Sequence, residues 1–88
     1  MRNSLNKQWI IFHLQEAHEE ILQTIEQLQT EPEYDENEFK IAVAHMYNHL
    51  NTAWNSRSVD DDRTANSSDR DFFEWRAFPT DILMGPRN

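Results

Sequence analysis

The feature that most constrains this chain is a long predicted helix with apolar residues on two sides. Between residues 11 and 28, apolar residues recur at alternating steps of three and four, which on a helix of 3.6 residues per turn form one stripe. The stripe consists of Ile11, Leu14, Ile21, Ile25 and Leu28, with His18 interrupting it. A second row points more than a quarter-turn away and consists of Leu5, Trp9 and Phe12. A helix that is apolar on two sides is normally surrounded, and an 88-residue chain offers little to surround it. We therefore expect self-association or a protein partner.

Local signals predict the ends of this helix and of a second one. Ser4 is a favourable N-cap and Pro32 disfavours helical backbone in the residue before it, so the first helix is predicted over about residues 4–29. Asp35, with a glutamate three residues later, resembles a capping box and predicts a second helix over about residues 36–57. The apolar positions of this second helix also recur in threes and fours: Phe39, Val43, Met46, Leu50, Ala53 and Trp54. A short link between two amphipathic helices makes them antiparallel neighbours.

The last third of the chain is predicted to be a loop, a short helix and a tail. Residues 58–69 are polar, contain an acidic triplet and lack periodicity, which predicts a mobile acidic loop. Ser68, with an aspartate three residues later, predicts a short helix over about residues 69–78, and Pro79 ends it. Residues 79–88 are predicted to form an extended tail whose apolar residues tuck against the helices: Ile82, Leu83 and Met84.

Aromatic residues are densest in the predicted short helix, which contains Phe72, Phe73, Trp75 and Phe78. Phe72 and Trp75 lie about one turn apart, so they can cover the second apolar row of the first helix. The alternative is a peptide that docks into a groove of a partner. We favour the structural interpretation, because so small a domain needs the burial.

Together these elements predict an all-α fold in a single domain. Its framework is an antiparallel two-helix hairpin, braced by a short C-terminal aromatic helix. A lone hairpin leaves one apolar side in water, so we expect two copies to pack as a homodimer that completes a four-helix bundle.

Composition excludes several classes of function. Sixteen acidic and eight basic residues give a formal charge of −8, which disfavours nucleic acid and anionic membranes and favours a basic protein as a further partner. The single glycine, Gly85, rules out phosphate-cradling loops. The chain has no cysteine and no apolar run of membrane-spanning length, so we expect a cytoplasmic protein.

Two histidines form the pattern that most suggests metal chemistry. His45 and His49 lie one turn apart on the same face of the predicted second helix, a spacing that can hold one divalent transition metal ion. His13 or His18 could supply a further ligand across the hairpin. The spacing resembles the His-x-x-x-His helix of DinB-like helical bundles, a resemblance that covers these two residues and implies a metal site. Positions beside an apolar stripe also commonly hold histidines without a metal, and we favour this interpretation.

His18 occupies a stripe position that usually faces a partner helix. A polar residue there can fix register or oligomeric state, and a buried histidine can act as a pH switch. The structural alternative is a partly buried imidazole that is hydrogen-bonded to Asn51 or Tyr47. We favour this alternative, because buried polar atoms nearly always find partners.

Polar side chains crowd the end of the predicted second helix, although asparagine is a modest helix former. The candidate recognition surface consists of Asn48, Asn51, Trp54, Asn55 and Arg57. Here Trp54 would be an anchor and Arg57 a fork for a carboxylate. Helix termination explains these residues equally well, because asparagine side chains bond loose carbonyl groups.

The sequence contains no nucleophile–base pair or carboxylate dyad with a geometric rationale, so no catalysis and no cofactor are expected. We expect a small acidic, non-catalytic helical module that binds proteins, with itself as the first partner. The alternative is a helical protein that binds a metal through its histidines.

Overall fold

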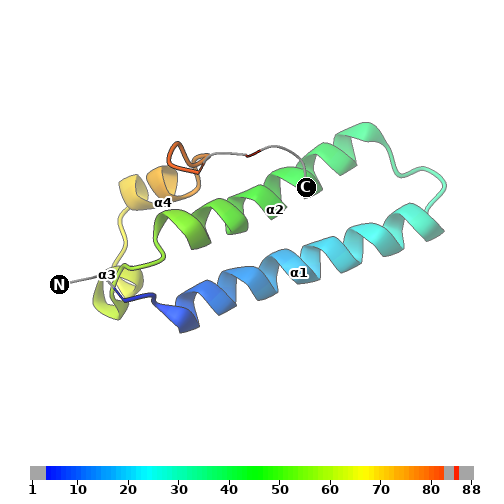
Figure 1. Ribbon diagram of the computed structural model, residues 1–88. Coiled ribbons are helices and arrows are strands. Elements are labelled where there is room, and N and C mark those ends of the chain that lie inside the picture. The colour runs from blue at the N-terminus through cyan, green and yellow to red at the C-terminus, as the bar shows by residue number, and fades with distance from the viewer. Residues whose placement is uncertain (1–3, 83–84, 86–88) are drawn as a thin grey trace.

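The computed structural model describes residues 4–82 and 85, and over these residues it is all-helical. Figure 1 shows two long helices that run side by side in opposite directions, α1 (Lys7–Thr30) and α2 (Glu36–Asn55). Two short helices follow, α3 (Asp61–Ala65) and α4 (Asp69–Trp75). The predicted all-α fold, a hairpin with a short aromatic helix, is confirmed.

Capping side chains explain where the two long helices begin. Asn6, rather than the predicted Ser4, caps α1, and its side chain accepts a hydrogen bond from the Trp9 amide at 3.2 Å. The predicted capping box of α2 is present. Asp35 Oδ1 accepts from the Glu38 amide at 2.9 Å, and Glu38 Oε1 accepts from the Asp35 amide at 3.4 Å. Each cap satisfies a backbone donor that has no partner inside its own helix.

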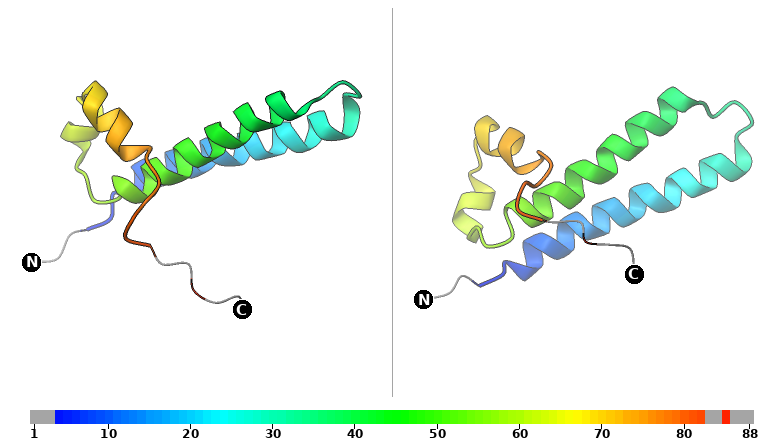
Figure 2. Two further views of the ribbon diagram at one scale, coloured as in Figure 1. Left: turned by 90° about the horizontal axis from the view of Figure 1, so that it is seen from above. Right: turned by 45° about the horizontal axis from the view of Figure 1, so that its top comes forward.

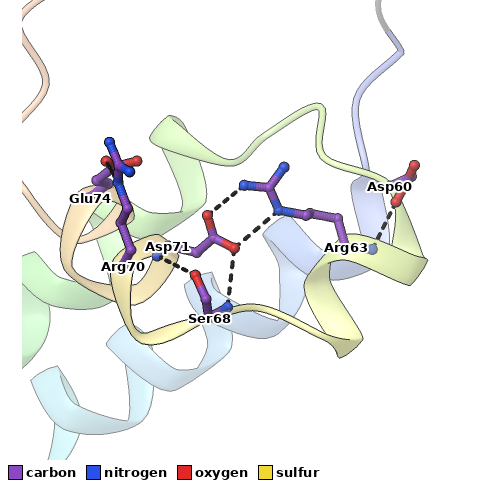
Figure 3. Close-up of polar contacts among 6 residues, drawn as sticks. All are labelled: Asp60, Arg63, Ser68, Arg70, Asp71 and Glu74. Carbon is purple, nitrogen blue, oxygen red and sulfur yellow. Dashed lines mark hydrogen bonds and ion pairs between the residues drawn. The ribbon is translucent and has the colours of Figure 1, made fainter.

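Residues 58–69 differ from the predicted acidic loop, because they contain α3. Asp60 caps this helix by accepting from the Arg63 amide at 2.8 Å, and the two aspartates that follow lie in the first turn, where a helix favours negative charge. Ser68 begins α4 with a second capping box. Figure 3 shows the Arg63 guanidinium reaching from α3 to Asp71 of α4, with Nε–Oδ2 at 3.0 Å and Nη2–Oδ1 at 2.5 Å.

The contact between α1 and α2, which we call the seam, is formed by small and polar side chains, and Ala53 is the one residue of the predicted apolar stripes that is buried. On α1 the seam passes through His13, Ala17 and Thr24, all buried, and each directly precedes a position of the predicted stripe. On α2 it passes through Ala42 and His49, which again precede stripe positions. The separation of helix axes depends on the side chains at the contact, so small residues allow a close approach that bulky ones do not.

α4 covers one end of the hairpin through its tryptophan. Figure 2 shows α4 standing to one side of the plane that contains α1 and α2. Trp75 is buried and packs edge-to-face on Trp9, with ring centroids 6.3 Å apart, while Trp9 Nε1 donates to Ser56 Oγ at 2.7 Å. The predicted cover over the second apolar row therefore reaches Trp9, whereas Leu5 and Phe12 remain about half exposed.

The described chain is elongated. Its radius of gyration is 15.3 Å, against about 12 Å for a compact domain of this length. Ile82 is exposed rather than tucked in, and Leu83 and Met84 lie outside the described residues. Within the described part, no helix has the length and apolar character needed to cross a membrane.

Candidate functional site

Both predicted apolar stripes lie on one face of the hairpin, which we call the apolar face. Each stripe residue directly follows a seam residue and is therefore turned by about 100° from it around the helix axis. Because α1 and α2 are antiparallel, this turn has opposite senses on the two helices, so both stripes point to the same side of the hairpin. Leu14 and Leu50 accordingly line one groove between the helices. The large side chains of the apolar face are 38–55% exposed: Ile11, Leu14, Ile21, Ile25, Leu28, Phe39 and Leu50.

α4 leaves this face uncovered because it packs on the opposite side. Phe72 and Trp75 line a cavity of about 100 Å³ together with Trp9 and Asn48. Asn48 precedes the seam residue His49, whereas the stripe residue Leu50 follows it. The aromatic helix and the apolar face are thus on opposite sides of the hairpin.

His18 lies on the apolar face and is exposed. The predicted hydrogen bond to Asn51 or Tyr47 is wrong, because Asn51 donates instead to the carbonyl of Arg76 and Tyr47 packs edge-to-face on Phe78. The one-residue offset between seam and stripe explains the difference, since it turns His18 away from α2.

Two asparagines of the candidate recognition surface fasten α4 to α2. Asn51 Nδ2 donates to the Arg76 carbonyl at 3.0 Å, and Asn55 Nδ2 donates to the carbonyls of Trp75 and Ala77, each at 2.7 Å. These carbonyls belong to the C-terminal end of α4, which lacks partners within the helix. Asn51 and Asn55 therefore bond free carbonyl groups at the end of α4, whereas the helix-termination interpretation placed such bonds at the end of α2.

Trp54 and Arg57 are also engaged within the chain. Trp54 Nε1 donates to Asp81 Oδ1 at 2.9 Å, and the Arg57 guanidinium lies 3.8 Å from the centroid of the Trp54 ring. Arg57 Nη2 is 3.9 Å from Asp81 Oδ2. Arg57 therefore lies near a carboxylate of the same chain, where a carboxylate ligand had been predicted. The Asn48 side chain forms no hydrogen bond within the described residues and lines two cavities.

The histidines separate into two contacts. His13 Nδ1 and His49 Nδ1 are 2.9 Å apart across the seam, so one ring donates to the other. Burial, with a smaller contribution from His49, lowers the pKa of His13 from 6.5 to about 4, so this imidazole is neutral at pH 7. His13 Nε2 is buried without a hydrogen-bond partner and lies among the rings of Trp9 and Phe12.

His45 lies elsewhere on the seam, where its Nδ1 is 3.5 Å from Glu20 Oε1. The structure thus joins His13 with His49 and keeps His45 and His18 apart from them. Within the described ranges, no group of three or more His, Cys, Asp or Glu side chains is placed to hold a metal ion.

Comparisons of the chain with protein-family models, curated proteins and solved structures give no match.

The sequence prediction missed Arg76, which lines a groove beside α2 together with Asn48. Composition contained a signal, because an arginine beside three aromatic residues favours stacking over an ion pair. The seam was missed because His13, Ala17 and Thr24 are spaced four and seven residues apart, and this weaker pattern lies beside a stronger apolar stripe.

Proposed function

We propose that this chain is a non-catalytic protein-interaction module whose apolar face pairs with a second copy to complete a four-helix bundle. The observation that carries the proposal is that both stripes project from the same side and remain about half exposed. Contiguous apolar surface of this kind marks an interaction site on a water-exposed molecule.

The size of the apolar face fits a stable pair. Seven large side chains, each about half exposed and each offering on the order of 80 Å², supply roughly 70% of the roughly 800 Å² per partner that a standard interface buries. A second copy is the natural occupant because each hairpin presents two parallel rows of apolar side chains, which is half of a four-helix bundle. The same rows appear on both copies, as a two-fold interface requires.

Matched substitutions on α1 test this proposal. Ile21→Arg places a charge in the apolar face, whereas Gln23→Arg places it on the opposite, exposed side of α1. We expect the unaltered chain and Gln23→Arg to sediment as dimers at micromolar concentration, and Ile21→Arg to sediment as a folded monomer. A monomeric unaltered chain, or equal dimerisation of both variants, would contradict the proposal.

Charge and composition support further features of the module. A net charge of −8 suits a basic protein as an additional partner and opposes nucleic acid. The absence of cysteine is consistent with the cytoplasm. The acidic triplet takes part in local structure, since Asp60 caps α3 and Asp61 Oδ1 accepts from Asn6 Nδ2 at 3.1 Å.

Metal binding is the second candidate, and the contact between His13 and His49 favours it. Two imidazole nitrogens 2.9 Å apart can bind one ion if water or Asn48 supplies the other ligands. We expect zinc to raise the Tm of the unaltered chain and of His18→Ala, but not of His49→Ala. If zinc, nickel and iron(II) all leave the Tm of the unaltered chain unchanged, this candidate is wrong.

A further inference from the structure

A groove of about 660 Å³ runs along the side of α2 that faces away from α1 and ends beneath the last turn of α4. Its lining residues come from α2 and from the segment that follows α4, and at one edge His45 also contacts Glu20 of α1. Its walls include Lys40, Ala44, Tyr47, Asn48, Arg76 and Phe78. No carboxylate of the described residues lines this groove, although the chain contains sixteen acidic residues.

Arg76 is the unusual member of this groove. Three of the four arginines that the structure describes pair with a carboxylate: Arg57 with Asp81, Arg63 with Asp71 and Arg70 with Glu74. Arg76 has no carboxylate partner among the described residues. Its guanidinium lies instead over two rings, 4.7 Å from the centroid of Phe72 and 4.6 Å from that of Phe73.

Contacts hold Arg76 at both its backbone and its side chain. Asn51 binds its carbonyl, and Asn55 binds the carbonyls on either side of it. Stacking on the two phenylalanine rings limits the rotamers of the side chain while leaving the in-plane N–H groups available to a carboxylate. A cation that is already ordered loses less entropy when it binds an anion.

A second cation and an aromatic pair define the length and floor of the groove. Lys40 makes no ion pair among the described residues and lies roughly 16 Å along α2 from Asn51, by the rise of an α-helix. Between them, Tyr47 and Phe78 pack edge-to-face with centroids 4.9 Å apart. Asn48 adds an amide that can both donate to and accept from a peptide backbone.

We propose that this groove binds a short acidic peptide in extended conformation, with Arg76 as the anchor for one carboxylate and Lys40 for the other. Side chains at alternate positions of an extended chain point to the same side, about 6.6 Å apart. A Glu-x-Phe-x-Glu segment therefore presents two carboxylates about 13 Å apart with a ring between them, which matches the two cations and the Tyr47–Phe78 floor. The negative charge of the whole chain opposes such a ligand, so recognition depends on these local cations.

The test is a titration of the full chain, labelled with ¹⁵N, by the peptide acetyl-Glu-Ala-Phe-Ala-Glu-amide. We expect saturable shifts at the side-chain amide of Asn48 and at Arg76 Nε–H, and at least about tenfold weaker binding of acetyl-Gln-Ala-Phe-Ala-Gln-amide. Arg76→Gln should lower the affinity at least about tenfold and Lys40→Gln by about threefold. The matched control is Arg70→Gln on the same helix, which lies outside the groove and should change the affinity by less than about twofold.

Several outcomes would overturn the proposal. These are equal binding of the two peptides, shifts confined to other residues, or equal losses in Arg76→Gln and Arg70→Gln. Tighter binding of an oligodeoxythymidine at the same amides would assign the groove to phosphates instead. If Arg76→Gln fails to fold, the comparison of the two peptides on the unaltered chain decides alone. Ile21→Arg should keep peptide binding, which separates this groove from the apolar face.

Discussion

Ser56 joins the two long helices through a single hydroxyl. It is completely buried, accepts a hydrogen bond from Trp9 Nε1 and donates one to the Thr52 carbonyl. The hydroxyl therefore ties the start of α1 to the end of α2 at the place where α4 packs. A buried hydrogen bond of this kind stabilises by about 1 kcal/mol, and an unpaired buried atom costs more.

Trp9→Phe should lower the free energy of unfolding by about 1–2 kcal/mol, because it removes the donor to Ser56 while keeping an aromatic ring against Trp75. Combined with Ser56→Ala, chemical denaturation should show a coupling energy of about 1 kcal/mol. Trp54→Phe is the control, since its bond to Asp81 is exposed. Additive effects of the first pair would mean that the hydrogen bond contributes nothing.

His13 should make the stability of the fold fall in mild acid. Its pKa is about 4 in the folded chain and about 6.5 in the unfolded one, so the unfolded chain binds the extra proton between these values. The free energy of unfolding should therefore decrease as pH falls from 6.5 to 4, on the order of 2 kcal/mol in all. His13→Gln should lose this dependence, and His45→Gln, whose imidazole is largely exposed, should keep it. A flat profile between pH 7 and 4.5 would be inconsistent with the burial of His13.

At the scale of elements, α3 and α4 are too short to persist alone, and one ion pair joins them to each other. Asp71 is buried and accepts from Arg63 and from the Ser68 amide. The hydrogen bond from Arg63, followed by that from Ser68, lowers the pKa of Asp71 to about 2. Its contribution to stability is therefore complete above the ordinary pKa of about 3.8 and disappears as pH falls toward 2.

Asp71→Asn should loosen α3 and α4 while leaving the hairpin intact, because the amide cannot pair with the Arg63 guanidinium as a carboxylate does. Hydrogen exchange should show reduced protection at the Trp75 amide and unchanged protection at the centre of α2. Asp69→Asn is the matched control, since it removes a charge from the same first turn without touching Arg63. Equal loss in both variants would indicate a helix-dipole effect instead.

The helices could be predicted from the sequence because their ends depend on residues close together in the chain. The packing of the helices against one another could not be predicted in this way. The capping boxes at Asp35 and Ser68 involve residues three positions apart, so the sequence alone identifies them. The seam through Ala17 and Ala42 could not be predicted, because periodicity identifies the most apolar side of a helix and not the side that its neighbour selects. The contacts of Asn51 with α4 join residues 25 positions apart and depend on the tertiary fold.

At the scale of the whole molecule, the layer that contains His18 and Met46 lies near the middle of the apolar face. A two-fold axis parallel to the helices, or perpendicular to them within the interface, brings this middle layer against its own copy. In the proposed dimer, His18 therefore meets the partner's apolar layer, where a polar side chain is unfavourable.

His18→Leu should strengthen dimerisation about tenfold, because it replaces a polar side chain in an apolar layer. Sedimentation equilibrium measures the dissociation constant of each dimer. Gln23→Leu, which adds a leucine on the opposite side of α1, should leave the dissociation constant unchanged. Equal dissociation constants for the unaltered chain and His18→Leu would exclude His18 from the interface.

The one-residue offset between seam and apolar face means that hairpin closure and surface recognition are encoded by different residues of the same two helices. Ile21 or Leu28 can change while Ala17 is kept, so a related sequence could bind a different partner and still form the same hairpin. The reverse also holds, since enlarging Ala17 or Ala42 would push the helices apart and disturb the spacing of both stripes at once. Natural variation that preserves the hairpin should therefore be low at the small seam positions and concentrated one residue further along each helix.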